Sequence, residues 1–326
     1  MTELERRYRR LLRAYPVDYR RERGDEIVGT YLDLAGPDRR WPSLTEAADL
    51  GRAGLRQRLR AAGAADLISG VRLAGLLALT TAAFLASFWV LAEQQEPPFG
   101  AGAPMFGPFV SVGIVAWCGW LLAALVAAIA PGRPARAAIT VALLATVAVP
   151  VVSALAGVPR PPLLVLAPQV ALGVLALAID DDLPAPARTL PVTATIVGGL
   201  LYYVMGLGAH WGAYRGGGEE FLPPTGTVLL LVVLLLAIGQ GMRRDTRGGW
   251  AVMALLTPVG LLNVHLLAGA VDGLASGAPH PTYPTMVGTA IAVALLGPAL
   301  LPAAVAVRRR LGIPPADPCP TCGRHR

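Results

Sequence analysis

The sequence contains no lysine, and all 28 of its basic residues are arginine. A phosphate-binding loop of the GxxxxGKS or GxxxxGKT type needs its lysine, and Schiff-base chemistry needs a lysine amine. Both are therefore excluded. The chain also lacks the HExxH motif of zinc proteases and the GxSxG motif of serine hydrolases, and it has only four histidines. We assign no catalytic residue and expect a non-enzymatic protein, while a membrane-embedded enzyme that acts on lipid stays open as a further class.

Charge is scarce and unevenly distributed. Charged residues make up 15% of the chain and hydrophobic residues 54%, whereas a soluble domain carries about 25% charged residues. Half of the arginines lie in the first 66 residues, and residues 67–307 are almost uncharged. A soluble core of that length could not cover itself with so few polar side chains. The composition predicts an integral membrane protein.

Eight apolar runs have about the 17 to 25 residues that a helix needs to cross a bilayer. They are Val71–Ala92, Pro108–Ala130, Ala137–Gly157, Pro162–Ile179, Thr189–Ala209, Thr225–Gly241, Trp250–Val271 and Thr285–Val307. The third and fourth are so close together that they could instead form a tight hairpin or a re-entrant pair. The expected fold class is an all-α membrane bundle of about eight helices over residues 67–307, with the lipid bilayer as its main partner.

The arginines also predict the orientation, because cytoplasmic loops of membrane proteins are enriched in basic residues. With the N-terminus inside and eight spans, 26 arginines lie on the inner side and only Arg160 and Arg215 on the outer side. We therefore expect a multi-pass protein of the cytoplasmic membrane with both termini in the cytoplasm. The acidic run Asp180–Asp182 then lies on the inner side as a solvated loop, which could pair with the nearby arginine clusters.

Residues 1–66 predict a small cytosolic domain of three short helices. In the first, Leu4, Tyr8, Leu11 and Tyr15 recur at helical spacing. The opposite face of this helix is basic and consists of Arg6, Arg9, Arg10 and Arg13. This face could be solvated over a packed core, or it could contact anionic lipid. Nucleic acid is not expected as a partner, because eleven acidic residues in the same segment weaken the positive field.

A resemblance appears in the same segment. The run Arg9-Arg10-Leu11-Leu12-Arg13-Ala14-Tyr15-Pro16, followed by Tyr19-Arg20 and by Arg23-Gly24-Asp25-Glu26, resembles the permease prefix domain of actinobacterial multi-pass membrane proteins, which are often encoded beside PadR-type regulators. The resemblance covers about the first 60 residues. It implies a prefix joined to a membrane domain and supplies no catalytic residue.

Related permeases carry large extracytoplasmic insertions, which this chain lacks. We therefore expect a sensing protein that couples to a cytosolic protein partner through residues 1–66. The alternative is a permease-like transport subunit. A homo-oligomer is compatible with either function.

The C-terminal tail, residues 308–326, contains a candidate metal site. Cys319 and Cys322 form a Cys-x-x-Cys pair and His325 follows it, so that three of the four ligands of a structural zinc site are present. Two other interpretations remain open, a redox dithiol and a tail that binds nothing. Zinc is the only cofactor that the sequence suggests.

Few polar side chains lie within the apolar runs. His265 and Asn263 fall in the seventh run, Gln169 in the fourth and Gln240 in the sixth. Polar groups at such positions are candidates for function, but they also form hydrogen bonds that hold neighbouring helices together.

Overall fold

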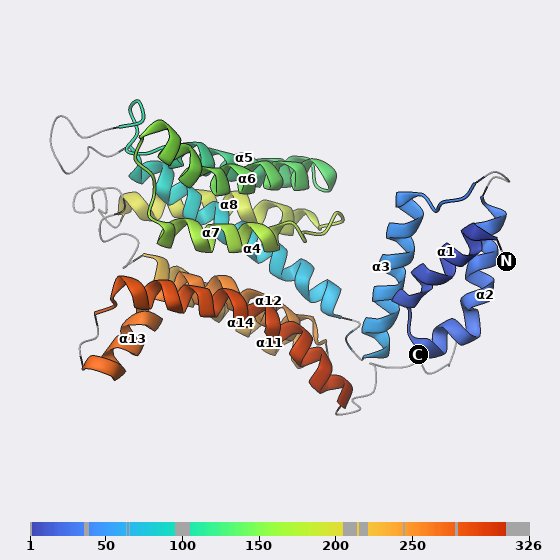
Figure 1. Cartoon of the computed structure of the whole chain (residues 1–326). Coiled ribbons are helices and arrows are strands. Elements are labelled where there is room, and N and C mark those ends of the chain that lie inside the picture. The colour runs from blue at the N-terminus through green and yellow to red at the C-terminus, as the bar shows by residue number, and fades with distance from the viewer. Residues whose placement is uncertain are drawn as a thin grey trace. The chain divides into compact units, whose positions relative to one another are not determined.

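The computed structural model describes residues 2–35, 39–62, 64, 66–94, 105–204, 214, 221–243, 245–277 and 280–310. In these ranges the chain is helical and contains no strand, apart from one isolated bridge between Phe106 and Phe109. The all-α fold class is therefore confirmed. The chain forms two compact units, residues 1–67 with 302–326 and residues 68–301. Figure 1 shows the helices of both units.

The first unit is built from three helices and a 3-10 turn: α1 Glu3–Leu11, η1 Leu12–Ala14, α2 Val17–Asp33 and α3 Leu44–Ala61. Helix α3 begins with a capping box, in which the Ser43 hydroxyl accepts the Glu46 amide at 3.2 Å. The Glu46 carboxylate in turn accepts the Ser43 amide at 2.8 Å. This reciprocal pair satisfies two backbone donors and fixes the start of the helix.

The first helix contributes a different set of residues to the core of this unit from the one that its spacing predicts. Leu4, Tyr8, Leu12, Tyr15, Val28 and Leu50 are buried. Leu11 was expected in this set but is only half-buried, because α1 ends at Leu11 and the tighter η1 turn directs Leu12 inward instead. The Tyr8 hydroxyl donates to Glu46 at 2.8 Å, and burial raises the pKa of Tyr8 to about 12. Tyr8 thus keeps its proton and joins α1 to the start of α3.

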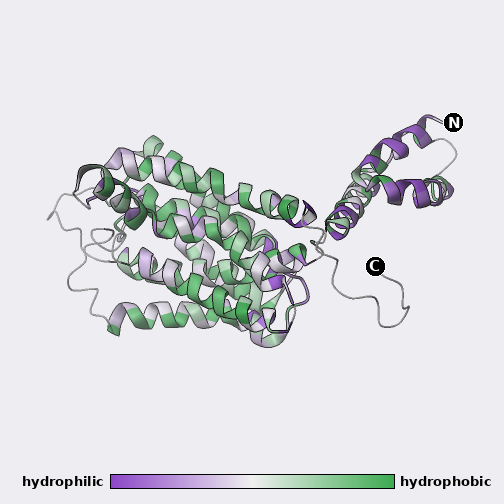
Figure 2. Ribbon diagram, turned by 90° about the horizontal axis from the view of Figure 1, so that it is seen from below, coloured by the Kyte–Doolittle hydropathy of each residue, from purple (hydrophilic) through white to green (hydrophobic). Residues whose placement is uncertain are grey.

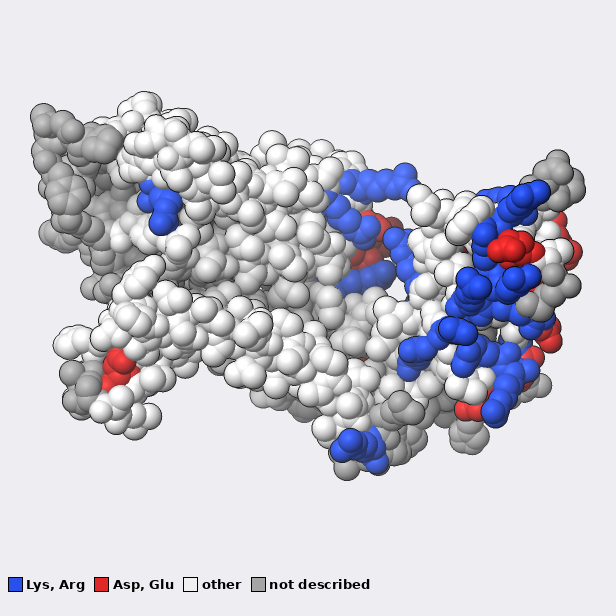
Figure 3. Space-filling model, in the orientation of Figure 1, with Lys and Arg blue, Asp and Glu red and all other residues white. Residues whose placement is uncertain are grey.

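The second unit contains the helices that correspond to the apolar runs. They are α4 Leu67–Ala92, α5 Gly113–Ile129, α6 Arg133–Ala156, α7 Leu163–Ala176, α8 Ala185–Val204, α11 Leu222–Gly241, α12 Arg247–Leu262, α13 Val264–Ser276 and α14 Tyr283–Arg310. Figure 2 shows that apolar residues dominate these helices, and Figure 3 shows little charge over them compared with α1, α2 and α3.

By length and composition, α4, α6, α11 and α14 could each cross a membrane. The pair α12 and α13 makes a fifth candidate, although it is bent by 70° at its break. The expectation of one continuous helix over Trp250–Val271 is therefore wrong. The break falls at Asn263, whose side chain donates to the Val259 carbonyl at 2.8 Å and so competes with the helical backbone.

Ion pairs join three connections at one end of this unit. Arg72 at the start of α4 pairs with Asp180 at 3.1 Å, and Arg136 at the start of α6 pairs with Asp181 at 3.0 Å. Both aspartates lie in the connection between α7 and α8. The expected pairing of this acidic run with nearby arginines is confirmed.

A close contact between α3 and the η1 turn provides a test of the first unit. A Cβ atom added at Gly54 would lie 2.7 Å from the Ala14 Cβ, whereas one added at Gly51 on the same helix meets nothing within 4 Å. We expect Gly51→Ala to stabilise the fragment 1–66 by up to about 1 kcal/mol through helix propensity. Gly54→Ala should destabilise it by about 1–3 kcal/mol through overpacking.

The measurement is urea unfolding of both variants, followed by circular dichroism. Equal effects of the two substitutions would contradict the close contact between α3 and η1.

Candidate functional site

A buried carboxyl group lies directly after α4. Glu93 is the first residue beyond this helix and its side chain is completely buried. It accepts the backbone amide of Ser111 at 2.6 Å, and it also accepts the hydroxyl groups of Ser111 and Tyr214. Three segments that are distant in the sequence therefore meet at this one side chain.

The surrounding residues hold this arrangement in place. The Trp117 indole on α5 donates to the Tyr214 hydroxyl at 2.9 Å. Tyr214 has a φ of 77°, a left-handed conformation that is rare for a residue with a side chain. At Gly113 an added Cβ would lie 2.9 Å from the Glu93 Oε1 atom. The backbone thus approaches the carboxyl group as closely as a glycine allows.

The environment of Glu93 changes its acidity. Burial raises the pKa of the Glu93 carboxyl, and the hydrogen bonds from Ser111 and Tyr214 oppose this shift only in part. Burial also raises the pKa of Tyr214 well above its ordinary value, so that the phenol stays a donor. Among the described residues, Glu93 forms no ion pair with an arginine. The group can therefore take up a proton in a site closed to water.

An aromatic cluster connects this carboxyl group to the interior of the bundle. Trp89 lies 5.1 Å from Tyr214 between ring centroids, and its ring also contacts Phe88 at 5.0 Å. Phe88 stacks on Phe221 at 3.8 Å, and Phe221 stacks on Phe84 at 5.7 Å. The last pair forms one end of a cavity.

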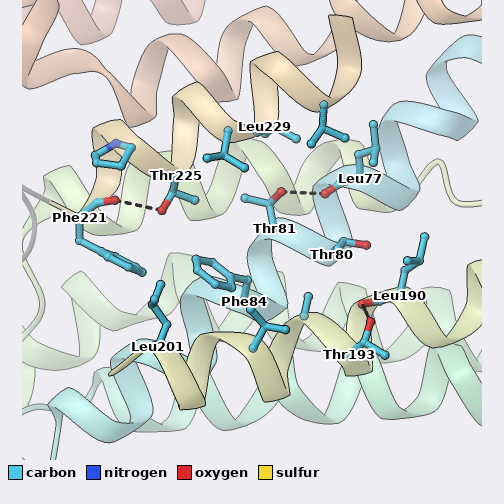
Figure 4. A pocket seen from close by; sticks show the side chains of 15 residues that line it. Leu77, Thr80, Thr81, Phe84, Leu190, Thr193, Leu201, Phe221, Thr225 and Leu229 are labelled. Atoms are coloured by element: carbon cyan, nitrogen blue, oxygen red, sulfur yellow. Dashed lines mark hydrogen bonds between the residues drawn. The ribbon is translucent and has the colours of Figure 1, made fainter. Parts of the chain in front are cut away.

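That cavity lies between α4, α8 and α11 and has a volume of about 690 Å³. Figure 4 shows side chains of all three helices directed into it. The lining residues are Leu77, Thr80, Thr81, Phe84, Leu190, Thr193, Ala194, Val197, Leu201, Phe221, Pro224, Thr225, Val228, Leu229 and Val232. None of these described lining residues is charged. The cavity falls within the size range of sites for small organic ligands.

Helix α8 is positioned beside α4 by a glycine. A Cβ atom added at Gly198 would lie 2.7 Å from the Phe84 carbonyl oxygen, whereas one added at Gly199 meets only the tip of Leu91 at 3.9 Å. Small residues of this kind let two helix backbones approach closely. The approach at Gly198 brings Val197 and Leu201 against α4 and so determines the width of the cavity.

Of the four polar residues expected within the bundle, Gln169 is the best defined. It is 1% exposed, and its amide donates to the Ala82 carbonyl of α4 at 3.1 Å. The interaction ties α7 to α4, which matches the structural interpretation of this residue. Gln240, in contrast, lies next to the last residue of α11, and its Oε1 atom is buried without a hydrogen-bond partner among the described residues.

Asn263 and His265 lie together at the bend between α12 and α13. Besides its bond to Val259, Asn263 accepts the Leu267 amide at 3.0 Å on its backbone oxygen. An added Cβ at Gly226 would lie 2.9 Å from the Leu262 Cβ, so α11 packs closely on this bend. His265 is half-buried in the first turn of α13. The structure does not bring these two residues together with Gln169 or Gln240 into one site.

The candidate zinc ligands Cys319, Cys322 and His325 lie outside the described residues, so zinc binding stays a prediction. In the described part of the chain, no three residues of the types His, Cys, Asp and Glu are grouped as a metal site. The basic face of α1 is exposed as expected at Arg6, Arg9, Arg10 and Arg13.

This face is partly neutralised by its neighbours. Arg9 pairs with Glu5 at 3.1 Å and with Asp25 at 2.9 Å. Arg6 lies 4.0 Å from Glu3.

Sequence reasoning did not identify Glu93 as part of a site. One signal was present in the sequence, since Glu93 directly follows an uncharged apolar run of twenty residues. What the sequence could not indicate is that Ser111 and Tyr214 fold onto the same carboxyl group.

The buried carboxyl group predicts a pH dependence of stability. Because folding raises the pKa of Glu93, the folded state holds this proton more tightly than the unfolded state. The resulting stabilisation is fully present below the unfolded pKa and is lost as the pH rises through the folded value. We expect the thermal midpoint of the protein in detergent to fall less steeply in Glu93→Gln than in the unchanged protein between about pH 4 and pH 8.

Asp182→Asn, at an exposed carboxyl group of the α7–α8 connection, is the matched control. It should leave the slope unchanged. Identical slopes in Glu93→Gln and in the unchanged protein would contradict a tightly held proton at Glu93.

No protein-family model matches the chain, and neither a curated protein nor a solved structure matches it.

Proposed function

We propose that the chain is a polytopic protein of the cytoplasmic membrane with eight spans and both termini inside. In this proposal it is not an enzyme. Its N-terminal helical domain couples the membrane domain to a cytosolic protein, so that the molecule acts as a sensor.

The observation that carries the proposal is the way in which the connections of the second unit sort into two groups. The arginine pattern assigns three places to the inner side: the start of α4, the start of α6 and the α7–α8 connection. Ion pairs join them, because Arg72 pairs with Asp180 and Arg136 pairs with Asp181. The outer connections also meet. Tyr214 contacts Glu93, and the Val112 amide donates to the Pro159 carbonyl at 3.1 Å. This sorting is what five successive membrane crossings by α4 to α8 would produce.

The outer surface of the unit supports a membrane location. Large hydrophobic side chains are exposed along α6, α8, α11 and α14, for example Leu155 at 84% and Leu295 at 68%. Apolar patches of this extent are rare on soluble monomers. In a lipid bilayer such exposed apolar side chains contact hydrocarbon and do not have to be shielded from water.

Helices α5 and α7 are shorter than a usual span, with 17 and 14 residues. Helix α5 packs against α6 and α8, and α7 packs against α6 and α12. Non-helical backbone at membrane depth is tolerated where protein surrounds it. Both helices can therefore cross the membrane with one face packed in the bundle, while exposed side chains such as Ile129 and Val174 face lipid.

The first unit presents an apolar surface at the end where α2 stops and α3 starts. Leu34, Trp41 and Leu44 are exposed there, and Leu44 reaches 91%. The Arg7 guanidinium lies 3.2 Å above the Trp41 ring and holds this side chain in place. An ordered, exposed tryptophan beside leucines is typical of a protein-binding surface.

Reporter fusions test the eight-span topology. Fusions after residues 100, 217 and 278 should report the outer side, and fusions after residues 132, 182, 246 and 312 the inner side. If only the five strongest candidate spans crossed the membrane, fusions after residues 132, 217, 246, 278 and 312 would each report the opposite side. A single such reversal would contradict the eight-span proposal.

Photo-crosslinking in cells tests the coupling role. A photoreactive amino acid in place of Leu44 should give a discrete adduct with one cytosolic protein, because this side chain is almost fully exposed on an apolar surface. The same amino acid in place of Arg52, an exposed position on α3, is the control and should give no such adduct. Adducts of Leu44 with lipid or with a second copy of the chain would contradict a protein partner at this surface.

A further inference from the structure

The side chains that line the cavity between α4, α8 and α11 offer a ligand no hydrogen-bond donor. Its four threonines direct their hydroxyl protons to carbonyl groups of their own helices: Thr80 to Leu76 at 2.8 Å, Thr81 to Leu77, Thr193 to Leu190 and Thr225 to Phe221, each at 2.9 Å. The donors of these side chains are therefore in use, and only their oxygen lone pairs and methyl groups face the cavity. A sugar, nucleotide or amino acid would lose its many hydrogen bonds to water on entry and find no donor and few acceptors in exchange. The chemistry of the lining therefore selects an apolar ligand.

The mouth of the cavity is apolar as well. Val197 on α8 and Val228 on α11 line the cavity and are also 55% and 59% exposed. Its inner wall, in contrast, is formed by the buried residues Thr81 and Leu229. The cavity is thus a groove that opens sideways between two helices. Helix α11 is itself long and apolar enough to cross a membrane. In the proposed membrane orientation the groove opens into the hydrocarbon, and an apolar chain can enter without crossing water.

The length of the groove indicates what fills it. Along α8 the lining extends from Leu190 to Leu201, and along α11 from Phe221 to Val232. At 1.5 Å per residue each stretch covers roughly 16 Å. This is close to half of the hydrocarbon thickness of about 30 Å, the depth that one leaflet contributes. The stacked rings of Phe84 and Phe221 close one end of the groove.

We propose that this groove binds a single acyl chain of a bilayer lipid. Lateral access, an uncharged lining and a length of about one leaflet all match such a chain. The inference rests on the proposed membrane location and adds a ligand to it. Phe221 lies at one end of the groove and stacks on Phe88. Phe88 contacts Trp89, and Trp89 contacts Tyr214, whose hydroxyl donates to Glu93. An acyl chain in the groove would therefore touch the aromatic cluster that packs against the buried carboxyl group.

The test uses the full-length protein in phosphatidylcholine vesicles that contain phosphatidylcholine with a diazirine in one acyl chain. After illumination, labelled peptides are mapped by mass spectrometry. We expect label on the lining of α4, above all at Leu77 and Thr81, because only a chain inside the groove reaches these side chains. Ala194→Phe fills the groove and should lower this label to background. Ala148→Phe, on an exposed face of α6, is the matched control and should leave it unchanged.

Val228→Trp at the mouth of the groove is a second variant on another helix, in case Ala194→Phe does not fold. Label confined to exposed faces such as that of α6, with none on the α4 lining, would overturn the acyl-chain site and leave the membrane proposal standing. Absence of label from the whole chain would overturn both proposals.

Discussion

In a helical unit with so little charge, a buried polar group is stabilised only by a partner within the protein, and apart from Gln240 the buried polar side chains discussed above have one. The Gln169 amide on α7 donates to the Ala82 carbonyl on α4. The Trp120 indole on α5 donates to the Thr146 hydroxyl on α6 at 2.9 Å. Glu93 is the largest case, because its carboxyl group gathers Ser111 and Tyr214 from separate segments. An unpaired group in any of these positions would cost more than its hydrogen bond contributes. Polar contacts thus fix which helices are neighbours.

Close packing then determines the shape of what remains. Gly198 brings α8 against α4, and Gly226 brings α11 against the bend at Asn263. On the other side of the unit, Trp117 and Trp120 are fully buried and fill the space around α5. The groove between α8 and α11 is the place where no large side chain fills the gap. The groove therefore results from the positions of glycine and aromatic residues along these helices. One end of it is formed by Phe84 and Phe221, which belong to the aromatic cluster that packs against Tyr214.

The two ends of the second unit have different chemistry. One is held by arginine–aspartate pairs at exposed positions, and pairs of this kind contribute little stability individually and weaken in salt. The other is held by a buried carboxyl group and its donors, where solvent screening is weak. A change of ionic strength therefore acts mainly on the first end and a change of pH mainly on the second. In the sensing role that we propose, such a difference would allow the two ends of the unit to respond separately.

The sequence by itself determined the all-α class, the approximate position of most of the apolar helices and the pairing of Asp180 with arginine. These features depend on neighbouring residues or on charge along the chain, which the sequence records directly. The tertiary structure alone decided that Leu12 and not Leu11 enters the core, that the seventh run bends at Asn263, and that Glu93 meets Tyr214. These depend on contacts between segments far apart in the chain, and helical periodicity carries no information about which helix lies beside which. The groove belongs to the same class, because its lining comes from three helices whose spacing only their packing sets.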